Sequence, residues 1–300
     1  IADYILVKQG GKINAVGTPD KPIVMTSEKE EPGAWGGIHI CGRAHTNAEG
    51  GKGSSEIGGA VYGGNDDADN SGTLQYIRLE YTGFAFDEEH EANGISFYSV
   101  GNGTIVDHCQ AYKGSDDGFE FFGGSVNVSN LVAVSCSDDS FDWTEGWNGK
   151  GTNLVAYQEA ESTLGYDCDC LMECDNNGSN NAATPVAHPV LKNLILVGNG
   201  GSKQGIRLRA GTEVEIDNAK VCGKGQPLTV ETALTENALK NGTSKLTNIT
   251  LTSELSSKEG IYTHADFIAV TSNKVDANLS YSSFEDIRKE CSWMNGSWVK

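Results

Sequence analysis

The sequence repeats itself at intervals of 22 to 24 residues, and this repeat limits the folds open to the chain. The segment Asp116–Phe121 recurs 22 residues later as Asp138–Trp143, with an Asp-Asp-(Gly/Ser)-Phe start in both copies. The tetrapeptide Asn-Leu-Val-Ala begins at Asn130 and recurs 23 residues later at Asn153. A unit of this length cannot bury its own apolar face, so successive units must stack on one another.

Each unit contains short stretches of alternating apolar and polar residues, separated by Gly, Asn, Asp and Ser. This alternation is typical of strands. Ser283–Glu290 is the one segment whose pattern suggests a helix. A propeller is the alternative, but its blades need about 40–45 residues. We therefore predict an all-β fold, a right-handed parallel β-helix with about 22 residues per coil. Residues 1–230 are expected to form its core and residues 231–300 irregular C-terminal coils or a cap of the same domain.

An asparagine stands at the same place in several repeats. Side-chain amides at one position of successive coils can bond to one another as a ladder, whereas an isolated asparagine in a turn would make only local bonds. The recurrence favours the ladder. Its expected members are Asn130, Asn153, Asn193, Asn218 and Asn248.

The chain is strongly acidic, with 22 Lys and Arg against 41 Asp and Glu and a net charge of −19. Such a charge disfavours nucleic acid and anionic lipid as partners. No apolar run approaches the roughly 18 residues of a membrane span, so no transmembrane segment is expected. The sequence begins at Ile1 without a signal peptide, which suggests a mature or trimmed form.

Cysteines and glycosylation sequons point to an oxidising, extracellular location, and a reduced protein with incidental thiols is the alternative. Disulfides are expected among eight cysteines whose connectivity stays open: Cys41, Cys109, Cys136, Cys168, Cys170, Cys174, Cys222 and Cys291. The candidate glycosylation sites are Asn102, Asn127, Asn177, Asn241, Asn248, Asn278 and Asn295.

Polar side chains lie between the inward apolar residues of one predicted sheet. If the coils are consecutive, these side chains point outward and form a file about 5 Å apart. Two carboxylates at that spacing repel by roughly 3 kcal/mol at an effective dielectric constant of 20. A solvated acidic face, a cation site and a catalytic site all remain open. The candidate catalytic residues of this file are His39, Glu120, Asp142, Glu173 and Arg207, and Ser96 completes it.

The same carboxylates could hold a hard cation. Calcium binds about six to eight oxygens, so Ca²⁺ is the expected ion if any is bound, although no cofactor is required. The paired aspartates could instead accept hydrogen bonds from backbone amides at the turns. The acidic loop Asp87–Glu91 either is solvated or extends the site. Zinc is unlikely, because Cys168–Cys174 lacks a second metal-binding knuckle. The candidate cation ligands are Asp116, Asp117, Glu120, Asp138, Asp139 and Asp142.

Long motifs in the first two thirds of the chain carry a resemblance to a known family. They are Lys12–Ser27, Gly33–Gly42, Tyr62–Asn70, Ser71–Tyr81 and the two Asp-Asp-(Gly/Ser)-Phe segments. With them, about Ile5 to Gly211 resembles a family of secreted or surface-anchored parallel β-helix proteins abundant in Bacteroidota. Members often carry a type IX secretion tail or a lipoprotein anchor, and their shape is similar to the pectate-lyase-like fold. The resemblance implies this fold and an extracellular or cell-surface location, but no reaction.

The sequence departs from that family in its many cysteines and sequons and in lacking the coils that normally precede Tyr4. An uncapped first coil would favour end-to-end packing into a homo-oligomer or polymer. We therefore expect a non-catalytic structural or adhesive protein. The alternatives are carbohydrate binding on the acidic face, aided by Tyr98 and Trp147, and a polysaccharide lyase or glycoside hydrolase at the same face.

Overall fold

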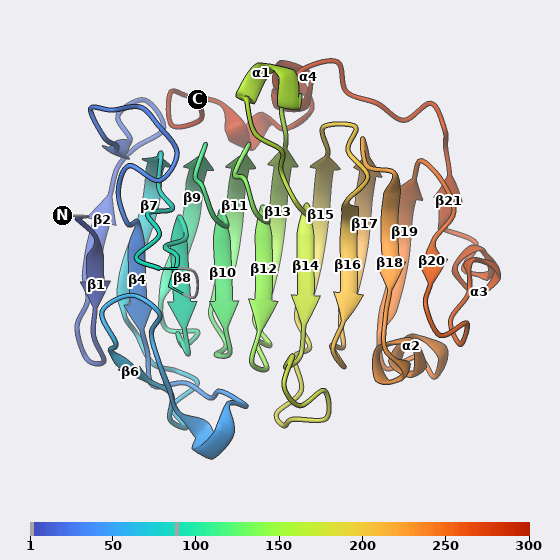
Figure 1. The fold of residues 1–300 in the computed structure, drawn as a ribbon, viewed down its shortest axis with the longest axis horizontal. Helices are drawn as coiled ribbons and strands as arrows, with labels where there is room; N and C mark the ends of the chain where they lie inside the picture. Colours follow the sequence, from blue (N-terminus) through green and yellow to red (C-terminus); the bar gives the residue numbers. More distant parts are fainter. Residues whose placement is uncertain (1–2, 88–89) are drawn as a thin grey trace.

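Two long parallel sheets run along the molecule in the computed structural model, which describes residues 3–87 and 90–300. The two sheets overlap in Figure 1, and their strands point in opposite directions. Sheet A follows the order β1 (Ile5–Val7), β4 (Ile38–Cys41), β8 (Ile95–Tyr98), β10 (Phe119–Phe122), β12 (Phe141–Thr144), β14 (Met172–Asp175), β16 (Gln204–Arg209), β18 (Gln226–Val230) and β20 (Ser256–Ser257). Sheet B follows the order β2 (Ile13–Val16), β7 (Gly72–Glu80), β9 (Ile105–Tyr112), β11 (Asn127–Val134), β13 (Lys150–Tyr157), β15 (Val190–Val197), β17 (Glu215–Cys222), β19 (Lys245–Leu251) and β21 (Lys274–Val275).

The chain alternates between the two sheets, and each strand pairs in parallel with the strand one coil away. This topology confirms the predicted parallel β-helix. The short strand β3 (Ile23–Met25) also pairs with β7, and β5 (Gly53–Ser54) pairs with β6 (Val61–Tyr62) in a small antiparallel sheet.

Aromatic columns fill the interior at the predicted register. Phe119 lies opposite Phe141 in the next coil, and their ring centroids are 5.6 Å apart in a stacked arrangement. Phe97 and Phe121 stack in the same way at 4.9 Å. Because inward residues repeat at the same position of each coil, every coil buries the apolar face of its neighbour, which is how short strands become stable.

The asparagine ladder is confirmed over part of its expected length. The Nδ2 group of Asn153 donates to Oδ1 of Asn130 at 2.8 Å, that of Asn193 to Asn153 at 3.0 Å and that of Asn218 to Asn193 at 2.9 Å. Asn248 leaves the ladder, because its amide donates to Asp217 at 2.6 Å. All these asparagines have positive φ angles between 56° and 66°, so each also bends its strand.

Replacing Asn153 should show how much the ladder stabilises the coil. Asn153→Ala removes two ladder bonds, each contributing about 0.5–1.5 kcal/mol, and places alanine at φ +60°, where residues other than Gly and Asn are strained by about 1–2 kcal/mol. Asn153→Gly loses the same bonds without that strain. We expect alanine to lower the urea midpoint more than glycine does. Equal midpoints for both variants and the wild type would contradict this account.

Helices cover the C-terminal end and one edge of the solenoid. The predicted helix at Ser283–Glu290 is present as α4 (Phe284–Glu290). The sequence did not predict α2 (Ala233–Lys240) and α3 (His264–Ala269), which lie at the C-terminal end in Figure 1. The remaining short helices are α1 (Glu161–Leu164), η1 (Glu49–Gly51) and η2 (Ser292–Met294).

Residues 276–300, here called the C-terminal strap, run back across the outside of sheet B towards the first coils (Figure 1). At its start, the Asp276 N–H donates to the Leu251 carbonyl at 2.8 Å. Near its end, the Ser297 N–H donates to the Pro19 carbonyl, also at 2.8 Å. The strap buries an apolar row of the outer face of sheet B beneath its own side chains, which include Ile287, Cys291, Met294, Trp298 and Val299. The strap thus joins the last coils to the first.

The predicted disulfides are not found, because all eight cysteines are buried free thiols. Their positions in the coils explain this result. Cys109 points into the core of β9, and its neighbour in the next coil is Leu131 rather than Cys136. Cys174 likewise lies beside Trp143. Cys109 and Cys174 therefore fill small apolar positions in the packed columns, as free buried cysteines commonly do.

Candidate functional site

The polar file predicted on one sheet is present on the outer face of sheet A. Glu120 lies in register with Asp142, Asp142 with Glu173, and Glu173 with Arg207. In the coils before these, Ser96 lies in register with Glu120, and His39 lies in register with Ser96. The strict alternation of side chains along each strand therefore brings together residues that are far apart in the sequence.

His39 holds its predicted place in this file but does not lie on an open surface. The side chain is fully buried, with the ring of Tyr4 edge-on at 6.1 Å and that of Tyr98 stacked at 6.4 Å. Burial lowers the pKa of His39 to about 4, and its Nε2 lies 2.6 Å from the Gly36 carbonyl. His39 is therefore a neutral packing residue away from the acidic residues of the file.

The central part of the file forms the floor of an open cavity of about 410 Å³, here called the acidic cleft. Loop residues from earlier coils form its wall. Among the described residues that line the cleft, none is aromatic and Arg207 is the one cation. The lining consists of Glu56, Glu91, Asn93, Asp116, Asp117, Glu120, Asp138, Asp139, Asp142, Asp169, Glu173 and Arg207.

The loop contribution was only partly foreseen. Glu91 comes from the acidic loop that the sequence suggested could extend a site, and residues 88 and 89 of that loop lie outside the described residues. Glu56 comes from the loop between β5 and β6, and no repeat or motif in the sequence marks it. Burial raises the pKa of Glu56 to about 7.

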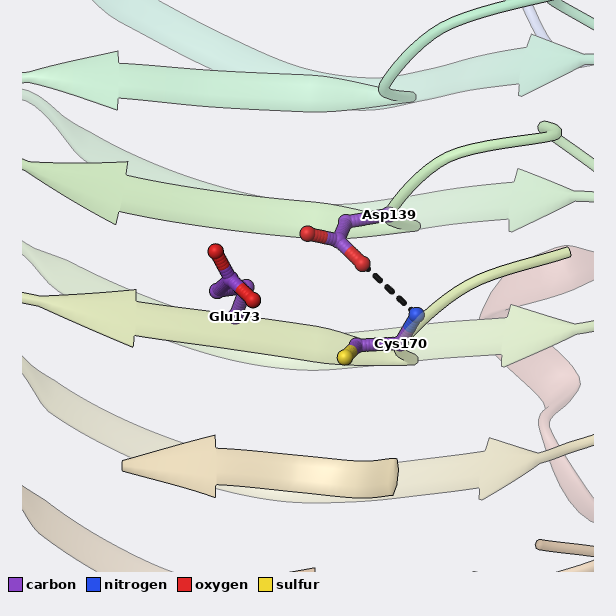
Figure 2. A group of neighbouring side chains, drawn as sticks. All are labelled: Asp139, Cys170 and Glu173. Carbon is purple, nitrogen blue, oxygen red and sulfur yellow. Dashed lines mark hydrogen bonds between the residues drawn. The ribbon is translucent and has the colours of Figure 1, made fainter. Parts of the chain in front are cut away.

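The second aspartate of each Asp-Asp pair bonds the backbone of the following coil. Asp117 Oδ1 accepts a hydrogen bond from the Asp139 N–H at 2.8 Å. Asp139 Oδ1 in turn accepts one from the Cys170 N–H at 2.6 Å, as Figure 2 shows. These bonds confirm the turn-stabilising alternative for Asp117 and Asp139, and they fix both carboxylates at the edge of the cleft.

The carboxylates of the cleft are close enough to bind a common cation. Oxygen atoms of Asp116, Asp117 and Asp138 lie within 4.8 Å of one another, and so do those of Asp117, Glu120 and Asp142. Burial, reinforced by the neighbouring carboxylates, raises the pKa of Asp116 to about 8 and that of Asp138 to about 6. The same causes raise the pKa values of the other three well above their ordinary range.

Few hydrogen-bond donors compensate this charge at the centre of the cleft. Glu120 Oε2 accepts a bond from Asn93 Nδ2 at 2.5 Å. Asp142 Oδ1 is buried and has no hydrogen-bond partner among the described residues. A buried carboxylate oxygen without a donor is costly unless it is protonated or bound to a cation. Crowded oxygen donors with an unsatisfied member therefore suit a hard cation such as Ca²⁺.

Arginines neutralise the end of the file nearer the C-terminus. Arg207 Nη1 lies 2.9 Å from Glu173 Oε1, and Arg207 Nε lies 3.2 Å from Glu231 Oε1. Arg209 pairs with Asp175 at 2.7 Å and also with Glu173. Glu231 and Glu173 raise the pKa of Arg207 above its ordinary value. Arg207 is therefore a fixed cation in an ion-pair network and is poorly placed to accept a proton.

A third group of potential ligands consists of Asp139, Cys170 and Glu173 (Figure 2). Asp139 and Glu173 also line the acidic cleft. Burial raises the pKa of the Cys170 thiol, and Asp139 and its other acidic neighbours raise it further. The protonated thiol favoured there is a poor metal ligand, because metals bind the thiolate. This cluster therefore has no chemistry that favours zinc.

The aromatic residues expected to help bind a carbohydrate do not face the cleft. Trp147 is buried in the core, where its ring stacks on Phe121 at 4.1 Å. Tyr98 is also buried, and its hydroxyl donates to Glu56 at 3.4 Å. Neither ring can stack on a sugar from outside, so the expectation for these two residues was wrong.

The sequons differ in whether their amide nitrogens are engaged. Asn177 Nδ2 donates to Asn47 Oδ1 at 3.0 Å, and Asn248 Nδ2 donates to Asp217. Attachment of a glycan at either nitrogen would disrupt these bonds. The other sequon asparagines are exposed: Asn102, Asn127, Asn241, Asn278 and Asn295.

The comparisons with known proteins agree with the fold. Curated proteins and solved structures give no match. In the described part of the chain, every helix is too short or too polar to cross a bilayer. A family model described as a pectate-lyase-like beta helix domain matches residues 1–299. The match covers nearly the whole chain, and the chain therefore belongs to the family of proteins with a pectate-lyase-like beta helix domain.

Proposed function

We propose that this chain is an extracellular protein that binds calcium in the acidic cleft and has a structural or adhesive role. The proposal rests on two groups of close carboxylates that share Asp117, and on the unsatisfied Oδ1 of Asp142 in the second group. The groups are Asp116, Asp117 and Asp138, and Asp117, Glu120 and Asp142. The extracellular location is supported by the family, whose members are commonly extracellular.

Calcium would offset the unfavourable free energy of burying several carboxylates close together in the folded chain. Without a cation, the buried carboxyls must either retain protons near neutral pH or repel one another. A calcium ion accepts six to eight oxygens at flexible positions and suits an irregular cluster of carboxylates better than Mg²⁺, which demands octahedral geometry. Charge in the cleft thus favours a cation over an anionic or apolar ligand.

The contacts of the other candidate residues argue against catalysis. Arg207 is ion-paired, His39 lies buried outside the cleft, and the described residues that line the cleft include no aromatic ring for a sugar. One observation favours the alternative of a glycoside hydrolase. Asp116 and Asp138 have pKa values of about 8 and about 6, so one can hold a proton while the other is ionised.

Calorimetric titration of the chelator-treated chain with CaCl₂ tests the proposal. We expect saturable binding to the wild type and at least about tenfold weaker binding to Glu120→Gln and Asp142→Asn, because each variant loses a charged ligand. At 100 times the dissociation constant, calcium should stabilise the wild type by about 2.7 kcal/mol.

Glu254→Gln is the matched control, because it removes one exposed carboxylate outside the cleft. It should bind calcium as the wild type does. Absence of calcium binding to the wild type, or equal binding by all variants, would refute the proposal. Cleavage of neutral or acidic polysaccharides by the wild type, abolished in Asp116→Asn, would establish the hydrolase or lyase alternative instead.

A further inference from the structure

A second cavity lies on the outer face of sheet B, between the strands and the C-terminal strap. Its volume is about 210 Å³, and the acidic cleft shares none of its residues. Sheet B provides the floor through β13, β15 and β17, and the end of α4 with η2 provides one wall. The lining is Asn153, Val155, Asn193, Leu194, Ile195, Asn218, Lys220, Glu290, Cys291, Ser292 and Trp293.

The asparagine ladder supplies hydrogen-bonding groups to the floor. Each Nδ2 group has two hydrogens, and the ladder uses one of them in Asn153, Asn193 and Asn218. The second hydrogen of each amide remains for another acceptor. Asn193 and Asn218 are exposed, so they mark the open side of the cavity. The floor therefore presents a row of amide donors at the spacing of neighbouring strands.

The wall combines an aromatic ring with a neutralised ion pair. Trp293 is partly buried and lines the cavity from the strap. Lys220 forms an ion pair with Glu290, whose Oε2 also accepts a hydrogen bond from the Tyr281 hydroxyl at 2.8 Å. Because the two charges cancel, the cavity favours an uncharged ligand with both an apolar face and hydroxyl groups.

We infer that this cavity binds one neutral sugar ring. A cavity of about 210 Å³ is many times larger than the roughly 10–15 Å³ that one water needs, which is room for a ring-sized ligand. The ring would place its apolar face against Trp293 and direct hydroxyls to the amides of Asn193 and Asn218. Glu290, fixed by Lys220, would accept a hydroxyl hydrogen.

Saturation-transfer NMR on the full chain tests the inference with glucose, galactose, mannose and N-acetylglucosamine as probes. We expect at least one of them to bind the wild type and to bind Trp293→Ala and Asn218→Gly at least about tenfold more weakly. Asn130→Gly is the matched control, because it breaks the same ladder at the same left-handed geometry but lies outside the cavity. It should retain binding.

Two further measurements distinguish sugar binding in this cavity from calcium binding in the acidic cleft and identify the form of the sugar. Binding should be unchanged by chelator and in Glu120→Gln, because the cavity is independent of the acidic cleft. The methyl glycoside of the preferred sugar shows which form the cavity accepts. If the methyl glycoside binds, the cavity can hold the end of a glycan. If only the unsubstituted sugar binds, the cavity is a site for the free sugar. The inference is wrong if no sugar of the panel transfers saturation from the wild type, or if both cavity variants, shown to be folded by thermal melting, bind like the control.

Discussion

Trp298→Ala is expected to lower the free energy of unfolding by about 3–5 kcal/mol, the usual cost of removing a large buried aromatic side chain. Trp298 is fully buried under the C-terminal strap. Its ring lies edge-on to Tyr76 at 6.1 Å and to His108 at 5.2 Å, so it fastens the end of the strap to the first coils. Urea denaturation followed by circular dichroism measures the effect.

The neighbouring Trp293→Ala provides the control for this prediction, because Trp293 belongs to the same segment but is only partly buried. Trp293→Ala should lower the free energy of unfolding clearly less than Trp298→Ala does. In addition, the wild type should unfold in a single transition. The unfolding transition of Trp298→Ala should be broader, because the coils unfold more independently once the strap no longer joins the last coils to the first. An unchanged midpoint in Trp298→Ala would show that the strap does not stabilise the solenoid.

Stability of the calcium-free protein is expected to fall as pH rises from about 6.5 to about 8, opposite to the behaviour of carboxyls that are ion-paired in the folded state. The folded-state pKa is about 8 for Asp116 and about 7 for Glu56, whereas both are near 4 in the unfolded chain. The folded state therefore binds more protons across this range. Each such proton lowers the free energy of unfolding by about 1.4 kcal/mol per pH unit.

Other groups do not reverse this sign within the stated range. His39, with its lowered pKa of about 4, opposes the trend mainly below about pH 7, because the unfolded imidazole, with a pKa near 6.5, binds little of a proton above that pH. Carboxyls whose pKa is lowered in the folded state, such as Glu80 and Asp107, are ionised in both the folded and the unfolded state across this range.

Thermal melts in chelator at a series of pH values measure the slope. Asp116→Asn should reduce the slope of stability against pH, and so should saturating calcium. In neither the variant nor the calcium-bound protein does an unpaired buried carboxyl at position 116 have to ionise. A calcium-free protein that becomes more stable between about pH 6.5 and about pH 8 would contradict the burial of these groups.

The coil register could be predicted from sequence because it depends on local patterns that repeat. Alternation fixes which side of a strand faces inward, and the recurrence of Asp-Asp-(Gly/Ser)-Phe fixes which residues of successive coils are neighbours. Those two facts were enough to place Glu120 beside Asp142 and to align the asparagines of the ladder. The residues that form the floor of the acidic cleft were therefore identified in advance.

What covers the coils could not be predicted, because it depends on segments without a repeat. Burial of His39 requires Tyr4 and Tyr98 to pack around it, and the wall of the cleft requires Glu56 from a distant loop. The cysteines were misinterpreted for a related reason. Composition suggested disulfides, whereas the register places thiols of the strands opposite apolar partners, as Cys109 is placed opposite Leu131.

The C-terminal strap also has a consequence for how the protein is made. A nascent chain emerges with its N-terminal end first, and coils can begin to stack before synthesis is complete. The residues that shield the outer face of sheet B, including Trp298 and Val299, follow the coils in the sequence and are therefore translated after them. Until then Val132, Val155 and Ile195 would face water. The newly made solenoid thus exposes an apolar face until the strap has been synthesised and has packed against it, and a chaperone that recognises apolar strands would act during that interval.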